Sequence, residues 1–143
     1  MNELTPVASI SHLKAVMDQG LADGTLQPVE APLEHYRAGD LYGRRMCIAA
    51  DSSFVTKVHK TDNFLIALRG HATVVNEKGE TYEVIAPQVL VTKPGTLRAV
   101  YTHTDIEWFT AHICPELEPE ERDRYLACDT MDEYIALQLE NQA

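Results

Sequence analysis

Residues 64–92 have the sequence FLIALRGHATVVNEKGETYEVIAPQVLVT, in which short runs of branched and aromatic residues alternate with turn residues. Such runs predict β-strands, and Gly70 and residues 76–79 (NEKG) predict the turns between them. The pattern extends outward in both directions. We therefore expect eight strands, at residues 44–50, 54–60, 64–69, 72–76, 81–86, 88–92, 96–102 and 106–113. No helical pattern interrupts them, which predicts a mainly β fold, an antiparallel sandwich or barrel.

The two flanks of this β region differ from it in charge. Residues 1–30 carry one basic and four acidic residues, residues 31–114 carry nine of each, and residues 115–143 carry two basic and nine acidic residues. Apolar residues at helical spacing predict an N-terminal helical arm in residues 1–30. In residues 115–143 we expect two acidic C-terminal helices, one at residues 120–128 and one that begins after Thr130. The balanced middle, residues 31–114, is the predicted barrel domain.

Composition excludes several classes of partner. The 143 residues suit one domain, and 12 basic against 22 acidic residues give a formal net charge of −10. Like charge disfavours nucleic acid and anionic membranes, and no apolar run approaches the roughly 20 residues of a membrane helix. Cys47, Cys114 and Cys128 are odd in number and far apart, which indicates reduced thiols. We expect a cytoplasmic protein without nucleic-acid or membrane partners.

Two polar stretches fall where a close-packed barrel would have aliphatic residues. In the first, Lys57 and His59 share one strand face and Asn63 begins the next strand. In the second, Arg98 follows the tight turn at Pro94-Gly95. The mouth of a small barrel is where alternating side chains converge on a ligand. Both stretches are therefore candidate site segments.

At these residues the chain resembles the cupins. The first cupin motif is His-x-His, three or four residues, Glu, six residues, Gly, and here Lys57, His59, Asn63 and Gly70 stand at those positions. The second motif is a Pro-x-Gly-like turn followed by a His, whose position Arg98 takes. The resemblance covers about residues 33–113. It implies a single double-stranded β-helix, or jelly roll, and a homodimer or higher homo-oligomer.

A narrower resemblance rests on residues 35–44 (HYRAGDLYGR) and 94–101 (PGTLRAVY), followed by Trp108 and His112. This pattern is similar to small, uncharacterised single-cupin proteins encoded in bacteriophage genomes. Where those proteins often carry two further His residues, this chain has Thr61-Asp62-Asn63. The resemblance implies action inside a bacterial host cell, for instance as a counter-defence protein that sequesters a host nucleotide signal. An alternative is a structural or assembly protein of a phage.

The metal motif of the cupins is degenerate here. Three His and one Glu usually hold Fe, Mn, Zn, Cu or Ni, and of those positions only His59 is retained. Fixed charges at Lys57 and Arg98 would repel a divalent cation by several kcal/mol at an effective dielectric constant of about 20. We therefore expect no metal or other cofactor. Any divalent transition metal would need a displaced site built from His59, His103 and His112.

The same substitutions favour a small anion. Lys57, His59 and Arg98 would attract a carboxylate or phosphate, which Arg98 can bind through a bidentate fork. Asn63 offers a donor and an acceptor, and Tyr101, Trp108 or Tyr36 could stack on a planar ring. The residues thus predict a non-enzymatic protein that holds a small anionic molecule, including a nucleotide-like one, in or near the barrel.

Other interpretations stay open from sequence. Lys57 and Arg98 could instead point outward and pair with acidic residues, or could lie in a dimer interface. The protein could be a metal-dependent oxygenase or isomerase that uses His59. It could also be a metal-free acid–base enzyme that uses His59 and Tyr101.

Overall fold

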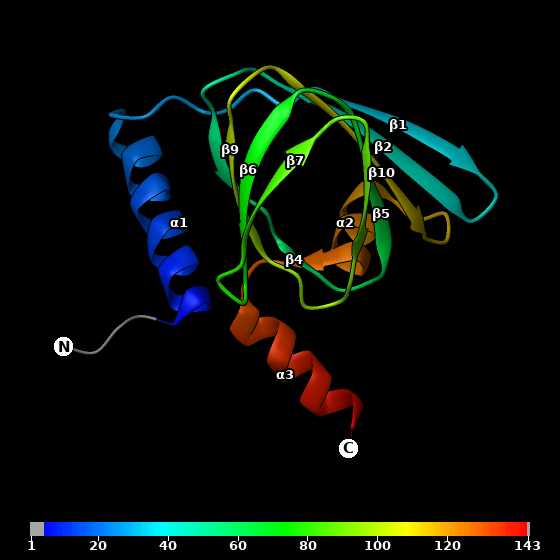
Figure 1. Cartoon of the computed structure of the whole chain (residues 1–143). Coiled ribbons are helices and arrows are strands. Elements are labelled where there is room, and N and C mark those ends of the chain that lie inside the picture. The colour runs from blue at the N-terminus through cyan, green and yellow to red at the C-terminus, as the bar shows by residue number, and fades with distance from the viewer. Residues whose placement is uncertain (1–4, 143) are drawn as a thin grey trace.

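A computed structural model describes residues 5–142 as a β-barrel with helices at both ends of the chain (Figure 1). The helices are α1 (Pro6–Asp23), α2 (Pro119–Leu126) and α3 (Met131–Asn141). The strands are β1 (Leu33–Ala38), β2 (Leu41–Ile48), β3 (Ser53–Val55), β4 (Val58–His59), β5 (Asn63–Arg69), β6 (His71–Asn76), β7 (Thr81–Ile85), β8 (Gln88–Thr92), β9 (Arg98–Thr102), β10 (Ile106–Ile113) and β11 (Ala127–Cys128). The predicted mainly β class with helical ends is confirmed.

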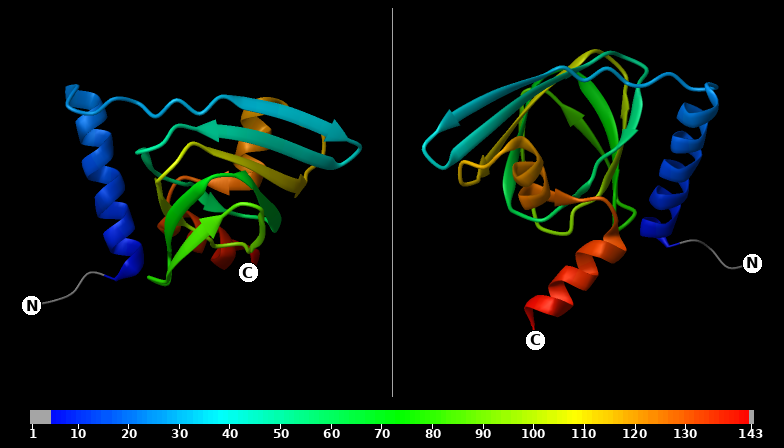
Figure 2. Two further views of the ribbon diagram at one scale, coloured as in Figure 1. Left: turned by 45° about the horizontal axis from the view of Figure 1, so that its top comes forward. Right: turned by 180° about the vertical axis from the view of Figure 1, so that it is seen from behind.

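Two antiparallel sheets form the barrel wall, as both views in Figure 2 show. One has the strand order β1-β2-β10-β5-β8 and the other has the order β3-β9-β6-β7. The predicted turn joins β6 to β7, where the backbone N–H of Gly79 donates to the carbonyl of Asn76 at 3.0 Å. Most other neighbours in the sheets are distant in sequence, for example β2, β10 and β5. This interleaving is the pattern of a double-stranded β-helix.

The core lies between the two sheets because alternate side chains of each strand point inward. On β6, Ala72 and Val74 are fully buried, whereas Thr73 faces outward. Burial of one such Val, Leu or Ile side chain contributes roughly 1.5–3 kcal/mol. The main core cluster is formed by Ile48, Leu65, Ala67, Ala72, Val74, Val84, Val100, Ile106 and Trp108.

The structure differs from several predicted elements; for example, the strand predicted at residues 44–50 is β2, Leu41–Ile48. The sequence pattern missed β1, because all six of its residues are exposed and it has no apolar face to signal a strand. The predicted strand at residues 54–60 is broken into β3 and β4, since Thr56 and Lys57 leave the ladder. The predicted helix at residues 120–128 ends at Leu126, and the next two residues form β11, which pairs with β4.

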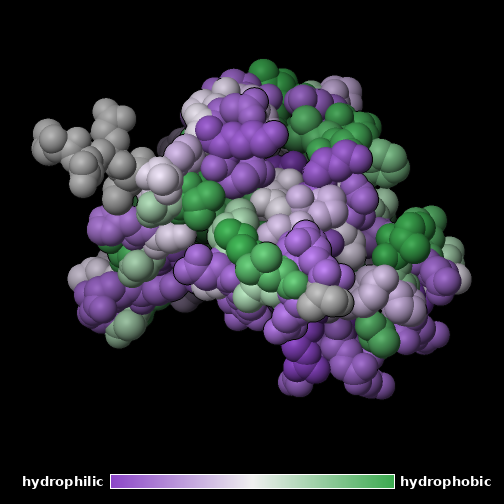
Figure 3. Space-filling view, turned by 90° about the horizontal axis from the view of Figure 1, so that it is seen from below, coloured by the Kyte–Doolittle hydropathy of each residue, from purple (hydrophilic) through white to green (hydrophobic). Residues whose placement is uncertain are grey.

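The helices differ in how they meet the barrel. Helix α1 packs on it through Ile10, which is buried beside Val58 and Leu97. Helix α3 has no buried residue and projects away from the barrel, after the predicted cap in which Thr130 Oγ1 accepts from the Glu133 N–H at 3.1 Å. Figure 3 shows the molecule from below, where hydrophilic residues predominate and hydrophobic ones form separate patches. The first turn of α3 packs on the barrel through Met131 and Tyr134, and the rest of the helix extends away from it.

All three cysteines are free thiols, and two of them, Cys114 and Cys128, are buried. No helix in the described part of the chain has both the length and the apolar character that crossing a bilayer requires. The cytoplasmic location, the homo-oligomer and the partner classes stay predictions.

Candidate functional site

A cavity of about 320 Å³ lies inside the barrel and opens to solvent. Its apolar wall includes Leu33, Met46, Phe54, Leu65, Trp108 and Leu126. Its polar wall includes Arg44, His59, Asn63, Arg98, Thr110 and His112. The cavity is thus divided between an apolar surface and a surface rich in hydrogen-bond donors.

The four positions of the cupin-like motif, Lys57, His59, Asn63 and Arg98, all line this cavity. The motif residues come from β4, β5 and β9 and the segment before β4, which the sheet pairing brings to one end of the barrel. Trp108, on β10, also lines the cavity and lies edge-on to Phe54 with ring centroids 6.4 Å apart.

Arg98 is the most deeply buried cationic residue of the cavity, with 5% of its surface exposed. Its backbone N–H donates to Thr56 Oγ1 at 3.1 Å, and its Nε donates to Tyr82 Oη at 2.9 Å. No carboxylate within residues 5–142 lies within salt-bridge distance of its guanidinium, and neither Nη donates to a protein group in that range. A buried guanidinium therefore faces the cavity without a counter-charge.

Arg44 is a second cavity cation, and the sequence analysis did not select it. It lies on β2, on the same strand face as Tyr42, Met46 and Ile48. Its neighbour Arg45 faces the other way and pairs with Glu107 at 2.7 Å. The alternation of Tyr42, Arg44, Met46 and Ile48 was the signal that could have identified Arg44.

Lys57 occupies the rim rather than the interior. Its side chain is 58% exposed, and its Nζ lies 3.3 Å from Asp129 Oδ1. One acidic residue, Asp123, also lines the cavity, and it accepts from Arg122 Nε at 3.2 Å. Lys57 thus lines the cavity opening and also forms an ion pair with an acidic residue at the surface, which was the alternative interpretation of this residue.

Two histidines, the half-buried His59 and the buried His112, line the cavity in their neutral form. Burial, then the charges of Arg98 and Arg44, lowers the pKa of His59 to about 4. Burial, then Arg44 and His59, lowers the pKa of His112 to about 4. Both rings are therefore uncharged at pH 7, so His59 adds hydrogen-bonding capacity to the cavity but not the positive charge expected from sequence.

These pKa values predict acid lability. An unfolded His titrates near pH 6.5, so below that pH the unfolded chain binds protons that the folded protein rejects until about pH 4. The free energy of unfolding should fall from pH 7 to pH 5 by up to about 1.4 kcal/mol per pH unit for each histidine. Urea unfolding of the His59→Gln/His112→Gln double variant should show a smaller slope. His12→Gln, at an exposed position on α1, should leave the slope unchanged. Equal slopes in all three proteins would contradict the prediction.

Two polar atoms of the cavity wall are buried without a hydrogen-bond partner. They are Asn63 Oδ1 and His112 Nδ1. Asn63 Nδ2 lies 3.5 Å from His59 Nδ1, and His112 Nε2 lies 2.9 Å from Thr110 Oγ1. Unpaired buried polar groups are costly, so these atoms are natural contact points for water or a ligand.

Two predicted site residues lie elsewhere. Tyr101 and His103 are on the outer surface, because the inward positions of β9 are Arg98, Val100 and Thr102. Tyr101 instead donates to Asp51 Oδ1 at 2.7 Å. The placement of Tyr101 in the pocket and the grouping of His103 with His59 and His112 are therefore wrong.

The cavity residues do not fit the metal that cupins commonly hold. Arg98 and Lys57 stand at two ligand positions, and Asn63 at a third. Among the residues that the structure describes, the one group of three His, Cys, Asp or Glu ligand atoms within 4.8 Å of one another is outside the barrel. Within residues 5–142, His59 and His112 thus have no third ligand of these types beside them.

The C-terminal segment closes part of the cavity. Asp123 and Leu126 of α2 and Ala127 of β11 line it. The carbonyl of Leu126 accepts from the Lys60 N–H at 2.8 Å, and Lys60 Nζ donates to the carbonyl of Arg124 at 2.6 Å. The segment is thus fixed to the strand that carries His59.

No protein-family profile matches the chain, and no curated protein is significantly similar to it in sequence. Solved structures are similar in fold. A cupin superfamily protein of Desulfitobacterium hafniense has 11% identity and a TM-score of 0.50, with 62% of this chain and 79% of that chain covered.

An RmlC-like cupin of Methanocaldococcus jannaschii with a double-stranded β-helix has 11% identity and a TM-score of 0.50, over 62% of this chain and 91% of that chain. A salicylate 1,2-dioxygenase of Pseudoaminobacter salicylatoxidans with gentisate adducts has 14% identity and a TM-score of 0.53, over 74% of this chain and 32% of that chain. With this interleaving of strands and these structural neighbours, the chain has the double-stranded β-helix fold of the cupins.

Proposed function

We propose that this protein binds a small anionic molecule in the barrel cavity without converting it. The observation that carries the proposal is the pair of arginines, Arg44 and Arg98, in one cavity. Neither forms a salt bridge within residues 5–142. A buried charge without a partner is expensive, and a bound anion would remove that cost. The chain as a whole has a net charge of −10, which makes this cationic interior distinctive.

The chemistry of the wall defines the ligand class. A guanidinium fork is suited to a carboxylate or phosphate, and Asn63 Oδ1 can accept from a ligand hydroxyl or amine. The rest of the ligand would meet an apolar surface formed by Trp108, Phe54 and Met46. We infer a compact anion with an apolar or aromatic body. Gentisate, held by the dioxygenase of similar fold, is an aromatic carboxylate, so this class is the first to test.

The low pKa values of the two cavity histidines favour binding over acid–base catalysis. A pKa of about 4 makes His59 and His112 weak bases at neutral pH, whereas an efficient general base has a pKa near the working pH. Tyr101, the proposed catalytic partner of His59, lies on the outer surface. A more specific form of this proposal is that the anion is nucleotide-like and that the protein is a phage counter-defence protein.

Native mass spectrometry of untagged, gently purified protein, followed by denaturation of the same sample, tests the proposal. We expect an adduct of a few hundred daltons per subunit that is released on denaturation. Thermal-shift titration with benzoate, gentisate, inorganic phosphate and a nucleoside monophosphate would then identify the class. If no adduct is found and none of these anions raises the melting temperature, the proposal fails.

A further inference from the structure

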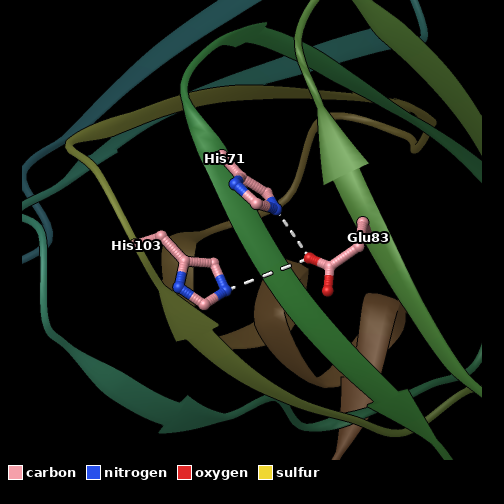
Figure 4. Close-up of side chains that lie close together, drawn as sticks. All are labelled: His71, Glu83 and His103. Carbon is pink, nitrogen blue, oxygen red and sulfur yellow. Dashed lines mark hydrogen bonds and ion pairs between the residues drawn. The ribbon is translucent and has the colours of Figure 1, made fainter.

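A cluster of two histidines and one glutamate lies on the outer face of the four-stranded sheet (Figure 4). His71 begins β6, Glu83 lies on β7 and His103 directly follows β9. These strands are neighbours in the order β9-β6-β7, so the three side chains meet on one surface. The side chains are between 37% and 48% exposed, which leaves the cluster open to solvent.

The separations of the donor atoms suit one metal ion. Glu83 Oε2 lies 2.7 Å from His71 Nε2 and 3.9 Å from His103 Nε2. All three ligand atoms lie within 4.8 Å of one another. Ligands at 2.0–2.1 Å from a tetrahedral Zn²⁺ are about 3.3 Å apart, a value that these separations bracket. Small rotations of half-exposed side chains would complete the geometry.

The backbone holds the two histidines together. The N–H of His103 donates to the carbonyl of His71 at 2.9 Å, and the N–H of His71 donates to Thr104 Oγ1 at 3.0 Å. The imidazole centroids are 4.5 Å apart. These backbone hydrogen bonds fix both Cα positions, so a metal would need to order only the two side chains.

Thr73 supports the cluster from the strand between its members. Its hydroxyl lies 2.8 Å from Glu83 Oε2 and 2.5 Å from His103 Nε2. The hydrogen bond to Glu83 can persist when the carboxylate binds a metal, and such contacts orient metal ligands in proteins. The contact with His103 Nε2 satisfies that nitrogen only in the absence of metal, and the metal would replace it.

We propose that His71, Glu83 and His103 form a binding site for a divalent transition metal ion, with the remaining coordination positions open to water. Two imidazoles and one carboxylate are a donor set for Zn²⁺, Fe²⁺, Ni²⁺ and related ions. On binding, each Nε2 gives up its hydrogen bond and its proton in order to hold the metal, and the neutral ring then carries its proton on Nδ1. The site lies outside the barrel wall, and none of its three residues lines the cavity. It is therefore independent of the proposed anion site.

Calorimetric titration of untagged protein with Zn²⁺ tests the site, since a polyhistidine tag would itself bind zinc. We expect one Zn²⁺ per chain and a higher melting temperature with zinc. His103→Gln and Glu83→Gln should each weaken zinc binding at least about tenfold. Co²⁺ titration should give the visible absorption of a His-ligated ion in the parent protein and lose it in both variants.

The controls separate this site from the barrel. His12→Gln removes an exposed histidine of α1, and His59→Gln removes a cavity histidine; both should keep full zinc affinity. His71→Gln provides a second test if His103→Gln does not fold. Zinc binding that survives in His103→Gln, is lost in His59→Gln, or is absent from the parent protein at micromolar zinc would overturn the proposal.

Discussion

Arg98→Ala should weaken anion binding by about 30-fold to several thousand-fold, because loss of one partner of a buried, hydrogen-bonded charge pair costs about 2–5 kcal/mol. Arg98 is 5% exposed and has no carboxylate partner within the described chain. Arg98 would therefore supply both the positive charge and the bidentate guanidinium that bind the anionic group of the ligand. Isothermal titration with the anion identified by mass spectrometry measures the loss.

The empty protein should respond differently to the same change. Arg98→Ala loses the bond from Nε to Tyr82, but it also removes a buried charge, so we expect a nearly unchanged melting temperature. Arg98→Lys should recover part of the affinity, since it keeps the charge without the fork. Arg45→Ala is the matched control, because Arg45 faces outward and pairs with Glu107. An Arg98→Ala protein that binds normally would exclude the cavity as the anion site; one that does not fold would make Arg98 structural.

Gly70→Ala should lower the free energy of unfolding by about 2–5 kcal/mol, the largest stability loss that we expect from a single added methyl group. Gly70 joins β5 to β6 with a φ of +92°, where an L-residue is strained. A Cβ at this position would overlap the backbone carbonyl oxygen of Asp105, which cannot rotate away. The strain and the overlap therefore add together.

Gly39→Ala isolates the first of these two effects. Gly39 also has positive φ, at +61°, but a Cβ there would meet no atom within 4 Å. We expect a loss of about 1–2 kcal/mol, the cost of the left-handed conformation alone. Urea unfolding of both variants gives the difference. Equal losses would show that the turn at Gly70 relaxes and that the contact with Asp105 has no effect.

Runs of branched and aromatic residues between turn residues made the barrel strands predictable, whereas exposed elements lack such runs. The strands predicted within residues 64–92 are present in the structure as β5 to β8. Strand β1 is exposed along its whole length, so its residues carry no such signal. The short pair of β4 and β11 joins Val58 to Cys128, a pairing that no local pattern could indicate.

The candidate site was predictable only in part. The cupin-like spacing selected His59, Asn63 and Arg98, which the structure brings to one cavity. Tyr101 is three residues from Arg98, and an odd separation along one strand puts two side chains on opposite faces, so alternation along β9 was the signal that could have assigned Tyr101 to the outer surface. The cupin-like spacing does not include Arg44, which stands beside the outward-facing Arg45, and the alternation along β2 was the signal for it.

The sequence by itself determined the β class, the hairpin after Asn76, the acidic flanks and the replacement of metal-ligand residues by Lys57, Asn63 and Arg98. These properties depend on residue type and local periodicity, which one chain displays directly. The tertiary structure alone decided that two arginines share a cavity, that His59 and His112 are neutral, and that His71, Glu83 and His103 meet outside it. Charge state and ligand geometry depend on burial and on contacts between strands far apart in sequence, and only the folded barrel creates those contacts.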